Sequence, residues 1–107
     1  MRRVAQVIRV RPERLEEYRE LHRAVPTPVL ERLRASRIGN YSIHLLGDRL
    51  FSYFEYHGDD LEADLAAIAA DPATQEWWKL TDPCQEPVPE AREGEWWAPA
   101  ERVFLME

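Results

Sequence analysis

The fold is decided by a stretch near the start of the chain, VAQVIRVRPERLEEYRELH at residues 4–22. Its first seven residues are rich in β-branched side chains, a composition that predicts a strand. Pro12 follows at a position that suits the first turn of a helix. From Glu13 onward the apolar side chains recur in steps of three and four, as on one face of an amphipathic helix. The stretch therefore predicts a strand that runs directly into a helix.

Tyr18 and His22 share the inward face of that expected helix. Residues four apart lie one above the other on a helix, and Leu15 and Val25 extend the same stripe. Histidine ordinarily titrates near neutral pH, which suits it to proton transfer. A histidine on an inward helix face is, however, more often a hydrogen-bonded core residue. Spacing alone therefore leaves a catalytic pair and a plain core contact as two open interpretations.

The sequence Pro26-Thr27-Pro28 interrupts the helix just beyond this pair. Proline removes a backbone donor and clashes with the preceding turn, so a kink or break is expected here. Thr27 is expected to cap a second helical piece that runs to about Ser36. Such a break would open a corner beside His22 where a small ligand enters. A plain kink around a small core explains the same pattern equally well.

Two strands joined by a tight turn are predicted next. Residues 40–46 and 50–56 are rich in strand-forming side chains, and Gly47-Asp48 lies between them as a hairpin signal. In residues 50–56 aromatic side chains fall on both faces. This predicts a sheet covered on both sides, by helices on one face and by a second copy of the chain on the other.

The second half of the chain predicts another interrupted helix. Leu61 to Ala69 indicates a short amphipathic helix, Asp71-Pro72 restarts it with an N-cap and a first-turn proline, and Asp82-Pro83 ends it. Residues 84–99 predict an extended arm, and residues 101–105 a final short strand. The order β-α-β-β-α-β is that of a ferredoxin-like split βαβ sandwich, an α+β fold with both helices on one sheet face. A single domain over residues 1–107 is expected.

The composition narrows the classes of function. The chain has 107 residues, a formal net charge of −6 and no apolar run near the ~20 residues of a membrane span. Its acidic balance argues against nucleic acid as a partner. Its single cysteine, Cys84, cannot form an internal disulfide, which fits a cytoplasmic location. The histidines lack metal-ligand spacing and no glycine-rich phosphate loop is present, so we expect a small polar substrate handled without a metal or other cofactor.

Aromatic residues supply the remaining candidates for a binding site. Trp77 and Trp78 are adjacent on a predicted helix and point about 100° apart, so one is expected to fill the core and the other to line a cleft. An indole suits the C–H face of a sugar ring, and its N–H can donate to a hydroxyl. Tyr41 either reaches a ligand from the sheet or is an ordinary strand aromatic. For Trp96-Trp97 in the arm, packing and a dimer interface are the favoured interpretation.

Taken together, these motifs resemble the L-rhamnose mutarotase family. The matching residues run in order over nearly the whole chain: Glu16-Glu17-Tyr18 with His22, Asn40-Tyr41-x-Ile43, Trp77-Trp78-Lys79 with Thr81-Asp82, and Val103-Phe104-Leu105. The resemblance implies a ferredoxin-like fold and a homodimer of the dimeric α/β-barrel type. It also implies an isomerase, an aldose 1-epimerase that interconverts the α and β anomers of L-rhamnose.

Carried over by position, the resemblance implies that His22 is the proton donor. It implies further that the sugar-binding residues are Tyr18, Tyr41, Trp77 and Trp78. The chain departs from the family at Pro26-Thr27-Pro28, where a tryptophan-proline-glutamate sequence is usual. Because that loop borders the sugar site in the family, the expected substrate is L-rhamnose or a related deoxysugar or aldose.

Mutarotation opens a cyclic hemiacetal and closes it on the other face, and it already proceeds in water. Positioned acid–base catalysis supplies about 10²–10⁴-fold, about 3–5 kcal/mol, which suffices without a covalent nucleophile. Two alternatives stay open. A cofactor-free monooxygenase of the dimeric α/β-barrel class would have a deep apolar cavity, and a non-catalytic small-molecule-binding module would have Tyr18 and His22 fully packed.

Overall fold

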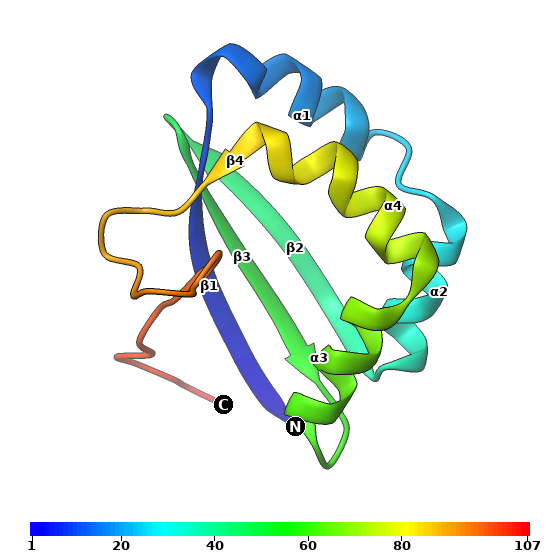
Figure 1. The fold of residues 1–107 in the computed structure, drawn as a ribbon. Coiled ribbons are helices and arrows are strands. Elements are labelled where there is room, and N and C mark those ends of the chain that lie inside the picture. Colours follow the sequence, from blue (N-terminus) through cyan, green and yellow to red (C-terminus); the bar gives the residue numbers. More distant parts are fainter.

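The computed structural model of the chain describes residues 1–107 as an antiparallel sheet flanked by helices (Figure 1). The strands are β1 (Arg2–Val10), β2 (Ile38–Leu46), β3 (Arg49–Tyr56), β4 (Gln85–Glu86) and β5 (Ala98–Pro99). The helices are α1 (Leu15–His22), α2 (Thr27–Ala35), α3 (Leu61–Ala70) and α4 (Pro72–Thr81), with short 3₁₀ turns at Pro12–Arg14 and Asp82–Cys84. None of the helices has the length and apolar character that a membrane crossing requires.

The sheet has the strand order β2-β3-β1-β4, and β5 pairs with β1 as well. β1 pairs antiparallel with β3 over nearly its whole length, from Arg2 opposite Tyr56 to Arg9 opposite Arg49. Each of the two predicted helical regions is present as a pair of shorter helices, α1 with α2 and α3 with α4. The predicted α+β fold class, a ferredoxin-like split βαβ arrangement, is confirmed.

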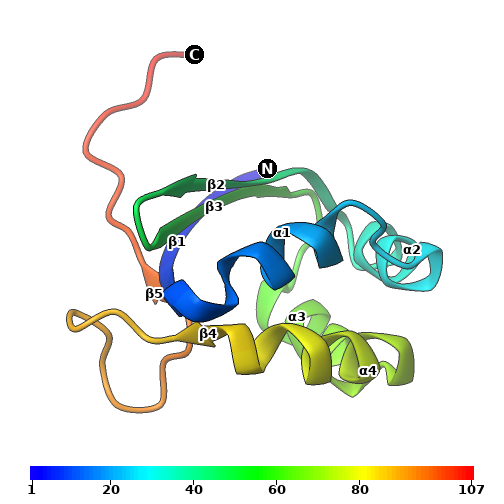
Figure 2. The same cartoon turned by 90° about the horizontal axis from the view of Figure 1, so that it is seen from above.

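All four helices lie on one side of the curved sheet, as the view from above shows (Figure 2). The residues of β3 that face the helices, such as Leu50 and Phe54, are buried, whereas Phe51 on the opposite face is 39% exposed. This alternation follows the period of two that a strand imposes on its side chains. The opposite face carries no helix, and the C-terminal residues run out on that side (Figure 2).

Local sequence signals set most element boundaries as predicted. The side chains of Asp60 and Asp71 cap α3 and α4 by accepting backbone N–H groups. Gly47 turns the hairpin with a φ of 63°, which glycine adopts without strain. The prediction that Thr27 caps α2 was wrong. Thr27 is already the first helical residue, because the extended backbone of Pro26 turns the chain one residue earlier.

Two buried clusters hold the sheet and the helices together. The first is centred on β1 and reaches α1, β3 and the 3₁₀ turn after α4; it consists of Ile8, Val10, Tyr18, Leu50 and Cys84. The second lies at the other end of the sheet and consists of Ile38, Phe54, Tyr56 and Ile68. Tyr18, which the sequence marked as a site residue, is therefore also part of the core, so its ring is anchored by packing.

The last strand of the sheet is not the segment that the sequence predicted. Residues 101–105 lie outside the sheet, while β4 and β5 occupy the edge of β1. Pairing ends where the N–H of Ala100 donates to the carbonyl oxygen of Ala5 at 2.8 Å. The run Val103-Phe104-Leu105 has strand propensity, but strand propensity depends strongly on context. The arm pairs with β1 at Arg9–Val10 and at Gln6–Val7, and this pairing does not continue along β1 to residues 101–105.

Candidate active site

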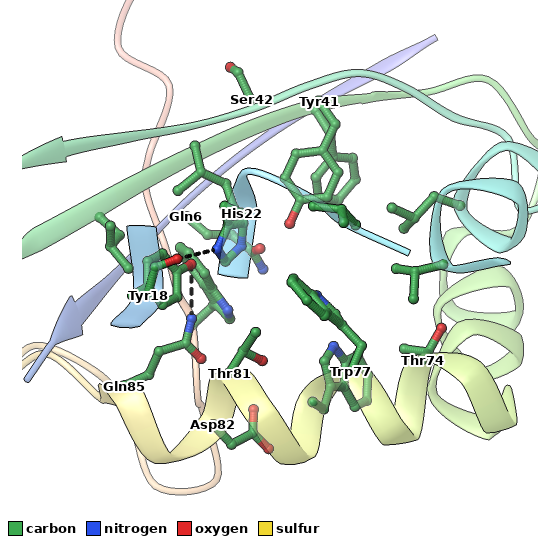
Figure 3. Close-up of a pocket in the computed structure, with 18 of the residues that line it drawn as sticks. Gln6, Tyr18, His22, Tyr41, Ser42, Thr74, Trp77, Thr81, Asp82 and Gln85 are labelled. Carbon is green, nitrogen blue, oxygen red and sulfur yellow. Dashed lines mark hydrogen bonds between the residues drawn. The ribbon is translucent and has the colours of Figure 1, made fainter. Parts of the chain in front are cut away.

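A cavity of about 940 Å³ lies between the sheet and the helices (Figure 3). Side chains from β1, β2, β3, α1, α2, α3 and α4 line it, together with residues from both ends of the arm. Its volume lies near the upper end of the roughly 300–1,000 Å³ that is usual for small-molecule sites. Of its 27 lining residues 18 are hydrophobic, so a ligand would meet mainly apolar walls with a few polar groups between them.

The five residues singled out from the sequence all line this cavity: Tyr18, His22, Tyr41, Trp77 and Trp78. The first two come from α1, the third from β2 and the two tryptophans from α4. Leu15 and Val25 line the cavity as well, so the inward stripe of the first helical region faces it. The stacking of α1 and α4 on the same sheet face brings these distant segments together.

The imidazole of His22 is held by a hydrogen bond and two ring contacts. Its Nδ1 lies 2.9 Å from the backbone carbonyl oxygen of Tyr18. Because a carbonyl oxygen only accepts, Nδ1 carries the hydrogen, and Nε2 is the nitrogen left free to exchange a proton. The ring centroid lies 4.3 Å from that of Tyr18 and 5.2 Å from that of Trp77, the latter in a T-shaped contact. The direction of Nε2 is therefore set by the protein.

The hydroxyl of Tyr18 accepts a hydrogen bond from Nε2 of Gln85 at 3.2 Å. Burial is the main factor that raises the pKa of this phenol above its ordinary value, since Tyr18 is only 5% exposed. The phenol therefore keeps its proton at neutral pH. It can donate a hydrogen bond to a ligand, but it cannot serve as a base there.

Tyr41 enters the cavity from an irregular part of β2. The register between β2 and β3 shifts between Gly39 and Ser42, and Asn40 adopts a φ of 46°. Figure 3 shows the hydroxyl of Tyr41 pointing into the cavity beside His22 and above Trp77. Desolvation raises the pKa of this phenol too, so it remains neutral. Of the two interpretations of Tyr41, the geometry favours a side chain that reaches a ligand.

The two tryptophans of α4 differ in burial. Trp77 is 9% exposed and packs against His22, whereas Trp78 is 38% exposed. Both nevertheless line the cavity. The expectation that one indole fills the core is right for Trp77, but the cavity extends around α4 far enough to include the other.

Sequence patterns missed two residues that close one end of the cavity, Gln85 and Trp96. Gln85 is buried, and its Oε1 accepts a hydrogen bond from the indole Nε1 of Trp96 at 3.0 Å. Trp97 packs against the core cluster around Ile8, and both Trp96 and Trp97 line the cavity. The arm has no periodic pattern from which the direction of its side chains could be predicted.

The loop after α1 contributes to the cavity through its neighbours. Pro26, Thr27 and Pro28 are exposed, whereas Val25 before them and Val29 after them line the cavity wall. The predicted helix break is present, and the apolar side chains on either side of it line the cavity. Any effect of this loop on ligand choice therefore acts through an apolar surface.

Two further titratable groups, Cys84 and Asp82, have pKa values raised by burial. Cys84 is fully buried, and burial raises the pKa of its thiol to about 11, so the thiol is not an ionised nucleophile at neutral pH. Asp82 lines the cavity, and partial burial raises the pKa of its carboxyl. No three His, Cys, Asp or Glu side chains are grouped in a way that could hold a metal ion. The polar groups that line the cavity thus include an imidazole, phenols, amides, hydroxyls, a carboxyl and the guanidinium groups of Arg19 and Arg23.

Comparison with known sequences identifies a matching family and similar proteins over most of the chain. The sequence model of a family described as L-rhamnose mutarotase matches residues 3–106. An L-rhamnose mutarotase from Listeria monocytogenes is 35% identical over 83% of this chain and 85% of its own length. A UPF0734 protein from Dictyostelium discoideum is 35% identical over 89% of this chain and 80% of its own length.

Comparison with solved structures supports the fold. The crystal structure of an L-rhamnose mutarotase from Formosa agariphila superposes with a TM-score of 0.79 and covers 100% of both chains. The two sequences are 21% identical, so this likeness concerns the fold alone. It extends over the helical layer, the sheet and the segments that surround the cavity.

Proposed function

The chain belongs to the L-rhamnose mutarotase family, and from this premise we propose that its cavity binds L-rhamnose or a closely related aldose and interconverts the α and β anomers. One observation carries the proposal. An imidazole with a free Nε2, two neutral phenols and two indoles from three separate elements line the same cavity. This is the set of groups that acid–base opening of a sugar hemiacetal requires, and it includes no covalent nucleophile.

In the proposed mechanism His22 handles the proton. The protonated Nε2 gives a proton to the ring oxygen while the bond from that oxygen to the anomeric carbon breaks. The anomeric hydroxyl releases its proton to water, which leaves an open-chain aldehyde. After rotation about the neighbouring carbon–carbon bond, the reverse steps close the ring on the other face. The hydrogen bond from Nδ1 to the carbonyl of Tyr18 keeps Nε2 directed at the substrate throughout.

The other four residues would bind and orient the sugar. Tyr18 and Tyr41 keep their protons at neutral pH because a phenol ordinarily loses its proton near pH 10 and desolvation raises the pKa of both, so each can donate to a sugar oxygen. The indole faces of Trp77 and Trp78 suit the C–H face of the ring. The apolar walls would accept the methyl group of a 6-deoxysugar in preference to a hydroxymethyl group.

The test is magnetisation transfer in proton NMR at anomeric equilibrium. Saturating the α-anomeric proton of L-rhamnose should reduce the β signal in proportion to enzyme concentration. The same measurement on L-mannose, which differs only by a hydroxyl on C6, measures selection for the methyl group. Exchange that stays at the protein-free rate for every aldose in a panel would overturn the proposed activity.

The size and apolar character of the cavity favour a second candidate, a cofactor-free monooxygenase acting on an apolar polycyclic molecule. A cavity of about 940 Å³ is larger than a monosaccharide needs. This candidate predicts that a polycyclic phenol quenches tryptophan fluorescence and consumes oxygen with the protein. Quenching without oxygen consumption would instead support the third candidate, a non-catalytic binding module.

We also propose that the protein is a homodimer that pairs through the open sheet face. That face carries Phe51 and Leu46, which are 39% and 76% exposed, and the C-terminal tail exposes Val103, Phe104 and Met106. Exposed apolar side chains that gather on one face often mark an interface. A cytoplasmic location is proposed as well, because a lone unpaired cysteine is usual in a reducing compartment.

Replacing Phe51 with lysine should convert the dimer to a monomer in size-exclusion chromatography with light scattering. The introduced charge would have to be buried without a partner at the interface. Leu80→Lys is the matched control, since Leu80 is also an exposed apolar residue but lies on α4, on the other side of the sheet. A wild-type protein that is monomeric at micromolar concentration would contradict the proposal.

A further inference from the structure

A chain of hydrogen bonds links the arm to the proposed substrate-binding tyrosine. Trp96 Nε1 donates to Gln85 Oε1 at 3.0 Å, and Gln85 Nε2 donates to the Tyr18 hydroxyl at 3.2 Å. All three residues line the cavity, and Gln85 is only 4% exposed. Figure 3 shows Gln85 below Tyr18, with the bond between them drawn and His22 on the far side of the phenol. The chain therefore runs from the arm toward the proposed proton-transfer group.

The direction of every hydrogen in this chain is determined. An indole N–H can only donate, so the group of Gln85 that faces Trp96 must be its carbonyl oxygen. The amide NH₂ is then turned toward Tyr18, whose oxygen has to accept. The phenolic hydrogen must point away from Gln85, and it has no acceptor within the chain. It is left free to bond a molecule in the cavity.

We propose that Gln85, oriented by Trp96, is a positioning residue that makes Tyr18 an obligatory hydrogen-bond donor to the sugar. Tyr18 then donates to a substrate oxygen while Nε2 of the neighbouring His22 exchanges the proton. This inference rests on the proposed function and adds to it the direction of one hydrogen bond, the one from the Tyr18 hydroxyl to the sugar. It also gives a role to the arm, because β4 places Gln85 and the far end of the arm brings Trp96 back to it.

The decisive variant is Gln85→Glu, which keeps the size of the side chain but replaces the donor with a carboxylate. Burial at this position raises the pKa of the introduced carboxyl, so the comparison starts at alkaline pH, where it is ionised. One carboxylate oxygen then still accepts from Trp96, and the other accepts from Tyr18. The phenolic hydrogen is drawn out of the cavity, so the mutarotation rate should fall roughly 10- to 100-fold. As the pH falls and the introduced carboxyl gains a proton, its O–H can donate to Tyr18 again. The ratio of the variant's rate to the wild-type rate should therefore rise toward acid pH.

Two variants separate this polarity effect from a structural one. Gln75→Glu makes the same charge change on the exposed side of α4, where the amide bonds only the carbonyl of Ala69, and it should leave the rate unchanged. In a Tyr18→Phe background, Gln85→Glu should cost less than about twofold, because the group that it reorients is absent. A full loss in both backgrounds would show that Gln85 acts by another route and would overturn the inference.

An activity-independent measurement keeps this inference distinct from the proposed function. The indole N–H resonance of Trp96, assigned by its disappearance in Trp96→Phe, should shift and exchange faster with solvent in Gln85→Met than in the wild type. If it does so while the wild type has no mutarotase activity, the hydrogen-bond chain stands and the proposed function fails. If the resonance is unchanged, the chain is absent in solution and the inference is overturned, whatever the activity.

Discussion

Replacing His22 with asparagine should lower the catalysed mutarotation rate by about 10²–10⁴-fold, the contribution of a well-placed acid–base group. In the wild type the carbonyl oxygen of Tyr18 accepts from His22 Nδ1 at 2.9 Å. The asparagine amide can keep a donor near that oxygen. It has no group in the place of Nε2 that could exchange a proton. The loss would therefore report on the free nitrogen and not on the helix contact.

The measurement is anomeric magnetisation transfer in L-rhamnose, with the protein-free rate subtracted because the sugar mutarotates unaided. His57→Asn is the matched control, since His57 is an exposed histidine in the loop after β3 and lies away from the cavity. It should retain the wild-type rate. A His22→Asn variant that keeps more than roughly a tenth of the wild-type rate would remove His22 from the mechanism.

The second large effect concerns stability. Ile8→Ala should lower the free energy of unfolding by about 2–5 kcal/mol, since Ile8 is 0% exposed on β1, which pairs with β3 on one side and with β4 and β5 on the other. A domain of this size has roughly 5–15 kcal/mol of net stability, so the loss is a large part of the total. The midpoint of thermal unfolding, followed by circular dichroism, should fall by on the order of 10 °C or more.

Leu80→Ala is the control for this prediction, because it removes a similar side chain from a position that is 50% exposed. Its midpoint should change by only a few degrees, as surface substitutions usually cost within about 0.5 kcal/mol. Ile8 shares its cluster with Tyr18, so Ile8→Ala should also loosen the proposed site. Equal midpoints for the two variants would contradict the placement of Ile8 in a buried core cluster.

Much of the fold could be predicted because its signals are local. The period of two in residues 50–56, the glycine turn before them and the aspartate caps of α3 and α4 each depend on residues within a few positions of one another. The stripe through Leu15, Tyr18 and His22 is likewise a property of one helix. Such patterns indicate which side of an element is apolar, and packing then requires that side to face inward.

The final strand could not be predicted, because strand propensity does not say which segment pairs with an edge. Residues 101–105 have suitable side chains, yet the two short segments that pair with β1 are β4 and β5, which lack a clear strand pattern. The role of Trp96 could not be predicted either, since it depends on an irregular arm that folds back to meet Gln85. In both cases the deciding contact joins residues far apart in the sequence.

The sequence by itself determined the first three strands, the two interrupted helical regions and the inward face of the first helix, because helices and strands impose fixed periods on their side chains. The five candidate site residues were indicated by the resemblance to a family and not by these periods. Only the tertiary structure decided that these side chains line one cavity, that Nε2 of His22 is the free nitrogen and that Gln85 directs the hydroxyl of Tyr18. Those properties depend on distances between separate elements, which only the packing of α1, α4 and the arm around the sheet can fix.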